Sequence, residues 1–145
     1  MKLLCNVTRG KNIESRHEVY VIVVDEKGKT IFSTGNPNYL TCLRSSLKPF
    51  QTSTAILSGA TKLVEFNTEE IALMCASHNG EKIHINIAKG MAKKLKLKET
   101  DYECGSHAPY DTESRKRASS SSFTPFHNNC SGKHSGMLAL AQQLG

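Results

Sequence analysis

The sequence lacks the features that assign a chain to a membrane or secreted class. It has no tryptophan, 6% aromatic residues, and no apolar run near the roughly 20 residues of a membrane span. The first residues, Met1 to Asn6, hold far too short an apolar segment for a secretory signal peptide. We therefore expect a cytoplasmic protein with no membrane partner. With 38% hydrophobic residues and a length of 145, the chain predicts one domain, 1–145, with one ordinary core.

The cysteines do not form the pattern of a disulfide-stabilised protein. They number five, which is odd, and they are irregularly spaced in a chain without a secretory signal. Free thiols or metal ligands are therefore expected. Cys5, Cys42 and Cys75 lie among apolar or β-prone neighbours, which predicts small buried hydrophobic side chains at these positions.

The net charge of +6 raises the question of a nucleic-acid partner. The lysine-rich segment 93–98 falls near the end of a predicted helix, where lysines complement the helix dipole. Few aromatic residues accompany it, and the chain has no recognisable nucleic-acid motif. A solvated helix end is the better explanation, so we predict no nucleic-acid partner.

Local patterns predict a hairpin followed by helices. The β-branched runs 19–24 and 31–34 are separated by five residues that include a glycine, which suits a hairpin turn. The segment 45–58 predicts a helix, with Leu47, Phe50 and Leu57 at near-helical spacing and Gly59 at its end. The pattern is therefore mixed, with strands before helices.

Further helices are predicted beyond this point, and one of them ends near residues 115–117. Asn67 can cap one of them by forming a capping box with Glu70. The next begins after Gly80 and is predicted to bury one apolar face. That face consists of Ile83, Ile87 and Met91. The last helix has an apolar face that must pack against something. That face consists of Met137, Leu138, Leu140, Ala141 and Leu144. The serine run 119–122 is interpreted as a surface loop.

A serine stands three residues before a lysine at Ser45 and Lys48, which places both on one face of a helix. A serine hydroxyl becomes a good nucleophile when a base removes its proton, and a desolvated lysine can be that base. Pro49 and Phe50 follow Lys48 and favour partial desolvation. Ser46 is a competing hydroxyl, but it would point to another part of the helix surface.

A second polar turn follows the predicted helix that ends near Ser77. Ser77 lies between this helix and Gly80, where a hydroxyl can face a cleft. His78 and Glu81 could bind polar groups of a substrate, or they could cap the next helix. The residues alone leave both interpretations open.

The segment 128–137 crowds a thiol, an amine, an imidazole and hydroxyls onto a turn that enters a helix. It is not a phosphate-binding loop, because histidines occupy the positions that require glycine and Ser or Thr. Cys130 at a helix N-terminus could be a nucleophile activated by His127 or His134. Cys130 with Lys133 is an unusual metal pair, and their spacing alone does not indicate a metal site.

Cys104 and His107 have a spacing that could also ligate a metal. A packed turn before Pro109 is the favoured interpretation of this segment.

Four segments in one order resemble the zinc-associated, serine-dependent L-asparaginase family that is often called asparaginase II. They are Arg44–Gln51, Ala76–Glu81, Glu103–Pro109 and Asn128–Met137. The resemblance implies an α+β fold like the serine β-lactamase and penicillin-binding proteins, with an antiparallel sheet flanked by helices. Family members are longer, so the chain looks like the N-terminal part of such an enzyme, and a homodimer is implied.

The resemblance implies hydrolysis of L-asparagine to L-aspartate and ammonia. Ser45 would attack the side-chain amide, Lys48 would act as base and Ser77 would aid proton transfer. Ser77 would also work with a second lysine that has no counterpart here. Arg44 is a candidate for binding the substrate carboxylate, or else forms a structural salt bridge. The resemblance assigns Cys130 and Lys133 to zinc, together with a third ligand, a cysteine, that this sequence does not contain.

Two other functions remain as alternatives. One is a non-catalytic metal-binding or interaction domain left by truncation of an enzyme. The other is a cysteine hydrolase that uses Cys130. The intact pair of Ser45 and Lys48 favours the serine enzyme, because random mutation of a truncated gene that had lost its catalytic function would not preserve this pair.

Overall fold

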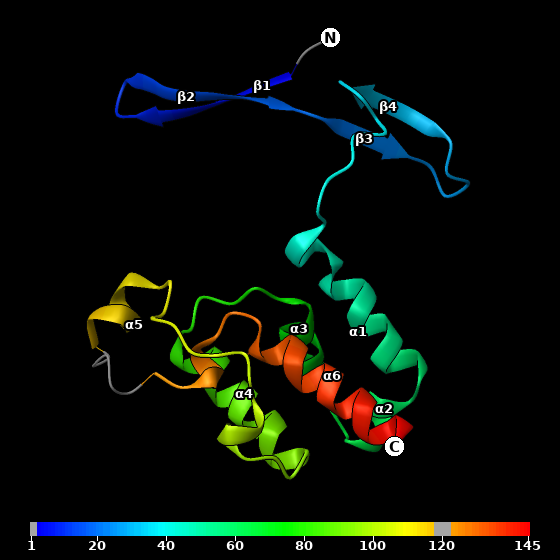
Figure 1. The fold of residues 1–145 in the computed structure, drawn as a ribbon, viewed down its shortest axis with the longest axis vertical. Coiled ribbons are helices and arrows are strands. Elements are labelled where there is room, and N and C mark those ends of the chain that lie inside the picture. The colour runs from blue at the N-terminus through cyan, green and yellow to red at the C-terminus, as the bar shows by residue number, and fades with distance from the viewer. Residues whose placement is uncertain (1–2, 118–122) are drawn as a thin grey trace. The chain divides into compact units, whose positions relative to one another are not determined.

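The structure is a computed structural model that describes residues 3–117 and 123–145. The predicted loop at 119–122 therefore lies outside the described residues. The chain divides into two compact units, residues 1–42 and residues 43–145. Among the described residues, the regular elements of the first unit are strands and those of the second are helices (Figure 1).

The first unit consists of two antiparallel hairpins. Their strands are β1 (Leu3–Arg9), β2 (Asn12–Val19), β3 (Val21–Val24) and β4 (Thr30–Thr34). The hairpin of β3 and β4 confirms the predicted one, and its turn is closed by Asp25, whose carboxylate accepts the backbone N–H groups of Lys27 and Lys29 at 2.9 and 2.8 Å. The hairpin of β1 and β2 was not predicted from the sequence.

The second unit is helical. Its helices are α1 (Lys48–Leu57), α2 (Ala60–Leu63), α3 (Thr68–Cys75), α4 (Lys82–Lys94), α5 (Thr112–Arg117) and α6 (Ser131–Leu144). A 3₁₀ turn, η1 (Arg44–Leu47), leads into α1. Figure 1 shows α6 running among the other helices, and its neighbours are α1, α2, α3 and α4. The helix starts and ends that local signals predicted are present, including the αL residue Gly59 after α1 and the capping box of Asn67 and Glu70 on α3.

Small residues let α6 pack closely against α3. The buried positions of α6 are Ser131, Gly132, Ser135, Gly136 and Ala139. A Cβ atom at Gly132 would lie 2.5 Å from the carbonyl oxygen of Leu73, and one at Gly136 would lie 2.3 Å from the Met74 side chain. Among the larger apolar residues, Leu138 and Leu140 are only partly buried, and Met137 and Leu144 are 47% and 75% exposed. The predicted apolar face of this helix is therefore not its most deeply buried face.

Two other predicted apolar faces also need correction. On α1, Phe50 and Leu57 are 70% and 87% exposed, and the buried residues are Lys48, Thr52 and Ala55. The helix thus turns its lysine inward, while its larger apolar side chains lie outside. On α4, the prediction of a buried Ile83 is wrong, because this residue is 62% exposed.

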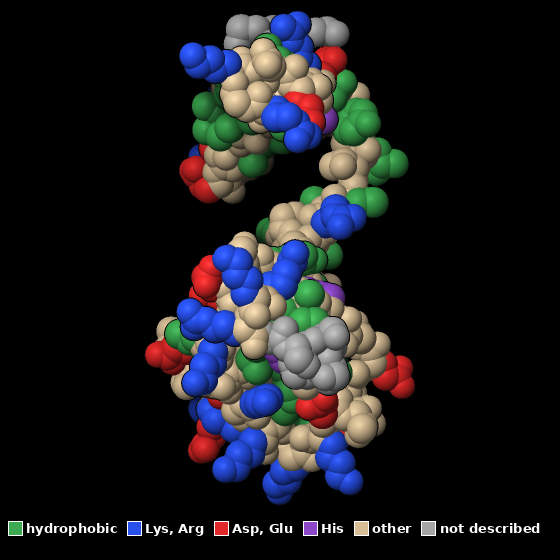
Figure 2. Space-filling view, turned by 90° about the vertical axis from the view of Figure 1, so that its left-hand side faces the viewer, with side chains coloured by type: hydrophobic (Ala, Val, Ile, Leu, Met, Phe, Trp, Pro, Cys, Tyr) green, Lys and Arg blue, Asp and Glu red, His purple; other side chains and the backbone are tan. Residues whose placement is uncertain are grey.

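The true core face of α4 lies beside the predicted one. It consists of Ala88, Met91, Ala92 and Leu95, and Ile87 is only partly buried. One lysine of the 93–98 segment joins this core to α3. Lys94 Nζ lies 2.7 Å from the carboxylate of Glu70, which is 5% exposed and also closes the cap of α3. The remaining cationic side chains include many that are exposed, and Figure 2 shows Lys and Arg spread over one face of this unit with Asp and Glu between them.

The cysteine predictions are corrected in part. All five cysteines are free thiols, but Cys5 and Cys42 are exposed and Cys75 is half-buried. They are therefore not the fully buried small side chains that their neighbours suggested.

The predicted α+β fold class agrees with the structure at the level of secondary-structure content. Helices and small antiparallel sheets make the chain α+β, but the strands form two separate two-stranded sheets. The resemblance to the serine β-lactamase fold stays a prediction. Within residues 3–117 and 123–145, no helix has the length and apolar character needed to cross a membrane.

Candidate active site

A cleft of about 320 Å³ lies where the start of α1 meets the start of α6. Its lining residues are Arg44, Ser45, Lys48, Gln51, Cys130 and Lys133. All of these except Gln51 were predicted as site residues from the sequence. The tertiary structure thus brings together two motifs that are more than 70 positions apart in the chain.

Lys48 is the most deeply buried charged residue of this site, at 2% exposure. Its ammonium Nζ donates to the carbonyl oxygen of Ala76 at 2.6 Å, to Ser77 Oγ at 2.8 Å and to the carbonyl oxygen of Asn129 at 3.4 Å. All three of its N–H groups therefore have acceptors, which offsets the cost of burying the amine.

The serine bonded to Lys48 is Ser77, whereas the sequence pattern paired this lysine with Ser45. Ser45 and Lys48 line the same cleft, but among the described residues no side-chain hydrogen bond joins them. Their link is through the backbone, where the N–H of Lys48 donates to the carbonyl oxygen of Ser45. The competing Ser46 donates its hydroxyl proton to the carbonyl oxygen of Leu43, so a local backbone acceptor occupies it.

Arg44 precedes Ser45 in an unusual backbone conformation. Its φ of 47° lies in the left-handed region, which costs a non-glycine residue free energy. The strain falls on the turn that presents Ser45 and Arg44 to the cleft. Both residues are exposed, so a small molecule in the cleft can reach them.

Ser77 is positioned by the end of α3. The helix stops at Cys75, and Ala76 is extended, with φ −92° and ψ 154°. This change in direction brings the Ala76 carbonyl and the Ser77 hydroxyl to the Lys48 amine. Ser77 itself is exposed.

His78 does not line the cleft. It is 3% exposed, its Nδ1 accepts the N–H of Gly80 at 3.1 Å, and its Nε2 lies 2.8 Å from Ser131 Oγ. Burial, followed by the nearby His84, Lys48 and His107, lowers the pKa of His78 to about 4. Of the two interpretations left open for His78, substrate binding and a structural role, these contacts favour the structural one.

Glu81 also takes part in a cap. It is the N-cap residue of α4, its backbone N–H donates to His84 Nδ1 at 3.3 Å, and its carboxylate lies 3.9 Å from the same nitrogen. The capping interpretation fits these contacts, and Glu81 is not among the residues that line the cleft.

Cys130 and Lys133 lie together on the α6 side of the cleft. The Cys130 thiol donates to Asn129 Oδ1 at 3.5 Å, and its backbone N–H donates to Asn128 Oδ1 at 2.9 Å. Over the ranges that the structure describes, no group of three His, Cys, Asp or Glu residues could hold a metal ion. Cys130 and Lys133 therefore supply two donors and do not complete a tetrahedral zinc site.

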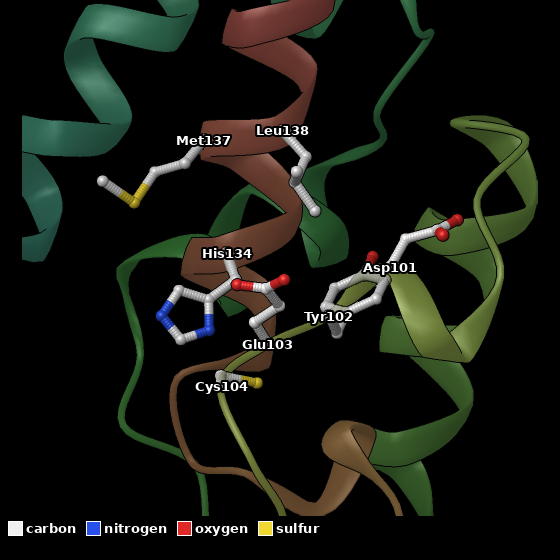
Figure 3. A pocket seen from close by; sticks show the side chains of 7 residues that line it. All are labelled: Asp101, Tyr102, Glu103, Cys104, His134, Met137 and Leu138. Atoms are coloured by element: carbon white, nitrogen blue, oxygen red, sulfur yellow. The ribbon is translucent and has the colours of Figure 1, made fainter.

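A second pocket, of about 490 Å³, lies on another side of α6. Its lining residues are Asp101, Tyr102, Glu103, Cys104, His134, Met137 and Leu138. Figure 3 shows His134, Met137 and Leu138 projecting from α6 beside the 101–104 segment. His134 Nδ1 is buried without a hydrogen-bond partner in the described part of the chain, and burial, followed by Lys133 and Lys48, lowers the pKa of this histidine.

The Cys104 and His107 pair forms a packed turn, as favoured from the sequence. His107 Nδ1 lies 2.8 Å from the carbonyl oxygen of Ala108, and its Nε2 accepts the N–H of Asn129 at 3.1 Å. Burial raises the pKa of the Cys104 thiol, which donates weakly to the Pro125 carbonyl at 3.8 Å. Both ring nitrogens of His107 are therefore used within the protein.

Two contributors to the site were missed in the sequence. Gln51 lines the cleft one helical turn after Lys48, and a helical reading of the segment could have indicated it. Asn129 contributes its backbone carbonyl to Lys48. No side-chain pattern could have indicated this contact, because every residue carries a backbone carbonyl.

The comparison with family models gives one match. The L-asparaginase II model matches residues 5–145, which is almost the whole chain. The protein is therefore of the asparaginase-type amidohydrolase class, and the chain belongs to the L-asparaginase II family. A search of curated proteins gives no match.

Proposed function

We propose that the protein hydrolyses L-asparagine to L-aspartate and ammonia through a covalent intermediate on Ser45. The observation that carries the proposal is the buried amine of Lys48, which shares a cleft with Ser45 and is hydrogen-bonded to Ser77. A buried amine that shares a cleft with one serine and is hydrogen-bonded to a second fits serine–lysine catalysis, in which the lysine activates a hydroxyl. Membership of the L-asparaginase II family supports the amide as substrate.

The charges that line the cleft favour an amino-acid substrate. Arg44, Lys48 and Lys133 are cationic, and none of the lining residues is acidic. A carboxylate is therefore attracted to the cleft. We assign the α-carboxylate of the substrate to Arg44, because its guanidinium can bind both oxygens and no carboxylate of the described residues pairs with it.

Two carbonyl oxygens and one hydroxyl group surround the amine of Lys48. These three partners match the hydrogen-bonding groups of a neutral amine, which is the form that acts as a base. A neutral amine has two N–H groups and one lone pair. The carbonyls of Ala76 and Asn129 can accept the two N–H groups, so the lone pair is left for the hydroxyl of Ser77. Ser77 can then pass a proton from the nucleophile to the amine.

The reaction follows in two halves. Ser45 Oγ attacks the carbonyl carbon of the side-chain amide, and its proton passes by way of Ser77 to Lys48. The C–N bond breaks as Lys48 returns this proton to the leaving nitrogen, which departs as ammonia. Water then attacks the aspartyl ester, giving its proton to Lys48, and Ser45 recovers a proton as aspartate leaves. Because the amine must be neutral, the rate is expected to rise with pH.

Zinc has no step in this mechanism. The resemblance assigns it to Cys130 and Lys133, but the donors among the described residues do not complete a site around this pair. We expect the chain alone to bind zinc weakly and to turn over slowly, because the resemblance places a further ligand and a second lysine outside this sequence.

One specific observation favours a second function. Cys130 is the N-cap residue of α6 and lines the same cleft as Lys133, so a thiol nucleophile could replace the hydroxyl. A non-catalytic binding domain would use the cleft without either nucleophile.

Asparagine hydrolysis in the presence of hydroxylamine separates these functions. Hydroxylamine captures an acyl-enzyme as aspartyl hydroxamate, and ammonia release reports the first half-reaction. We expect the unmodified chain and Cys130→Ala to yield both products, with or without a chelator, and Ser45→Ala to yield neither. Loss in Cys130→Ala with retention in Ser45→Ala would instead support the thiol nucleophile. No product from the unmodified chain at high protein concentration would support the binding domain.

A further inference from the structure

His78 is the residue that joins the Ser77 turn to the start of α6. The segments 76–80 and 126–131 lie side by side, and the backbone N–H of His78 donates to the carbonyl oxygen of Asn129 at 3.1 Å. The same carbonyl also accepts from Lys48 Nζ. The backbone of His78 and the amine of Lys48 therefore meet at one acceptor.

The hydrogen bonds of the His78 ring define its tautomer. Nδ1 accepts the N–H of Gly80, so this nitrogen carries no proton. The proton of the neutral ring is on Nε2, which donates to Ser131 Oγ at 2.8 Å. Ser131 is fully buried, and its hydroxyl donates in turn to the carbonyl oxygen of Phe126 at 3.4 Å. A continuous chain of hydrogen bonds thus runs from the Ser77 turn into α6.

This chain is closely packed at Gly80 and at the His78 ring. Gly80 has a φ of +74°, and a Cβ atom there would lie 3.1 Å from the Pro109 backbone. The His78 ring stacks on His84, with ring centroids 5.1 Å apart. The ring can therefore move little, and neither can the Ser77 turn that carries it.

We propose that His78 is a positioning residue that holds Ser77 against Lys48 by tying the 76–80 turn to Ser131. The role of His78 in catalysis rests on the function proposed above. The effect of His78 on the surroundings of the Lys48 amine does not depend on that function. A small displacement of a relay group can lower turnover by about a hundredfold. The link to Ser131 is the important one, because the bond to Gly80 closes only the turn itself.

Two variants of similar shape each keep only one of the two hydrogen bonds of the His78 ring, either the bond to Ser131 or the bond to Gly80. In His78→Gln the side-chain amide can still donate to Ser131, as Nε2 does. In His78→Asn the shorter amide oxygen can still accept from Gly80, as Nδ1 does, but the link to Ser131 is lost. Ser131→Ala removes the same link from the other side. His84→Ala is the matched control, because it removes a stacked imidazole that makes no hydrogen bond to Ser131.

Competitive acetylation with mass spectrometry reports the environment of Lys48 without any assay of hydrolysis. Lys94, which pairs with Glu70, is the internal reference. We expect acetylation of Lys48 relative to Lys94 to rise several-fold in His78→Asn and Ser131→Ala, and to stay near the wild-type ratio in His78→Gln and His84→Ala. Ser131→Ala should add nothing in the His78→Asn background. Unchanged ratios in His78→Asn and Ser131→Ala would overturn the proposal, and so would an equal rise in all four single variants.

Turnover provides a second readout. For asparagine, we expect kcat of His78→Asn to fall about tenfold or more, with KM changed less than about twofold, and kcat of His78→Gln to be largely retained. A rise in KM at constant kcat would mean that His78 binds substrate, contrary to the proposal. If the unmodified chain does not hydrolyse asparagine, the proposed function fails, and the acetylation ratios still decide whether His78 positions Ser77.

Discussion

The two units of the chain differ in what supports their backbone. In residues 3–42, Thr34 is the only buried residue, and the strands are organised by backbone ladders and by contacts such as Tyr20 stacked on Tyr39 at 4.7 Å. In residues 43–145, a buried core surrounds α6, and every residue of the candidate active site lies there. Hairpins can form from local pairing alone, whereas a buried amine needs a core that excludes water and aligns its acceptors.

The largest difference between the units should appear in catalysis. Lys48→Met is expected to lower kcat for asparagine by on the order of 10²–10⁴-fold, because it removes the base. Lys48→Arg should be equally damaging, because a guanidinium keeps its proton. Lys29→Met, in the β3–β4 turn, should leave kcat unchanged. Substantial activity in Lys48→Arg would remove this lysine from the mechanism.

Truncation of an apolar side chain should have unequal costs in the two units. Met91 is fully buried, so Met91→Ala is expected to lower the free energy of unfolding by about 2–5 kcal/mol. Ile31 in β4 is 67% exposed, so Ile31→Ala should cost no more than about 0.5 kcal/mol. Urea unfolding followed by circular dichroism measures both changes. Equal costs would show that the hairpin unit has a core of its own.

A pair of glycines tests how close the α3–α6 contact is. A Cβ atom at Gly132 would lie 2.5 Å from a backbone oxygen of Leu73, whereas one at Gly90 in α4 would meet only the Glu70 side chain, at 3.8 Å. Gly132→Ala is expected to destabilise the chain by about 1–3 kcal/mol through overpacking. Gly90→Ala should instead stabilise it by about 0.5–1 kcal/mol, because alanine favours the helix. Stabilisation in both variants, measured as a rise in Tm, would contradict the close packing.

A dependence of stability on pH gives a comparison of single histidines in the two units. The pKa of His78 is about 4 in the folded chain against 6.5 for a free histidine, so below pH 6.5 the unfolded state binds a proton that the folded state does not. The contribution of His78 to stability is therefore fully present above pH 6.5 and falls as the pH drops toward 4, by about 2 kcal/mol at pH 5. Urea midpoints between pH 7.5 and 5 measure this loss.

Two histidine variants are the controls for the pH series. His78→Gln should weaken the dependence but not abolish it, because burial also lowers the pKa of His134 and of His127, whereas His17→Gln on β2, where the ring is exposed, should leave it unchanged. The same pH slope in His78→Gln would assign the dependence to other groups.

Features that depend on neighbouring residues were predictable from the sequence. The β3–β4 hairpin, the Asn67 cap of α3 and the end of α1 at Gly59 are all present. Turns and caps are formed by side chains a few positions away, so their signals are local. The β1–β2 hairpin was missed because both of its faces are largely exposed and it carries little apolar alternation.

The faces of the helices were not predictable to the same degree. Spacing alone favoured Phe50 and Ile83 as inward residues, yet Lys48 and Ala88 are buried instead. Which side of a helix faces inward depends on what the neighbouring helix presents. Here α6 presents serines and glycines, which leave room for close backbone packing and for polar groups but not for large side chains.

The sequence by itself determined the reactive groups, their order along the chain and the family to which the chain belongs. Ser45, Lys48, Ser77 and Cys130 were named from local patterns, and Lys133 was named from the family resemblance. Only the tertiary structure decided which of them meet. It bonded Lys48 to Ser77, placed Cys130 and Lys133 on the cleft and turned His78 toward Ser131. The physical reason is that a hydrogen bond depends on distance and direction in space, and packing of α1, α3 and α6 sets both for residues far apart in the chain.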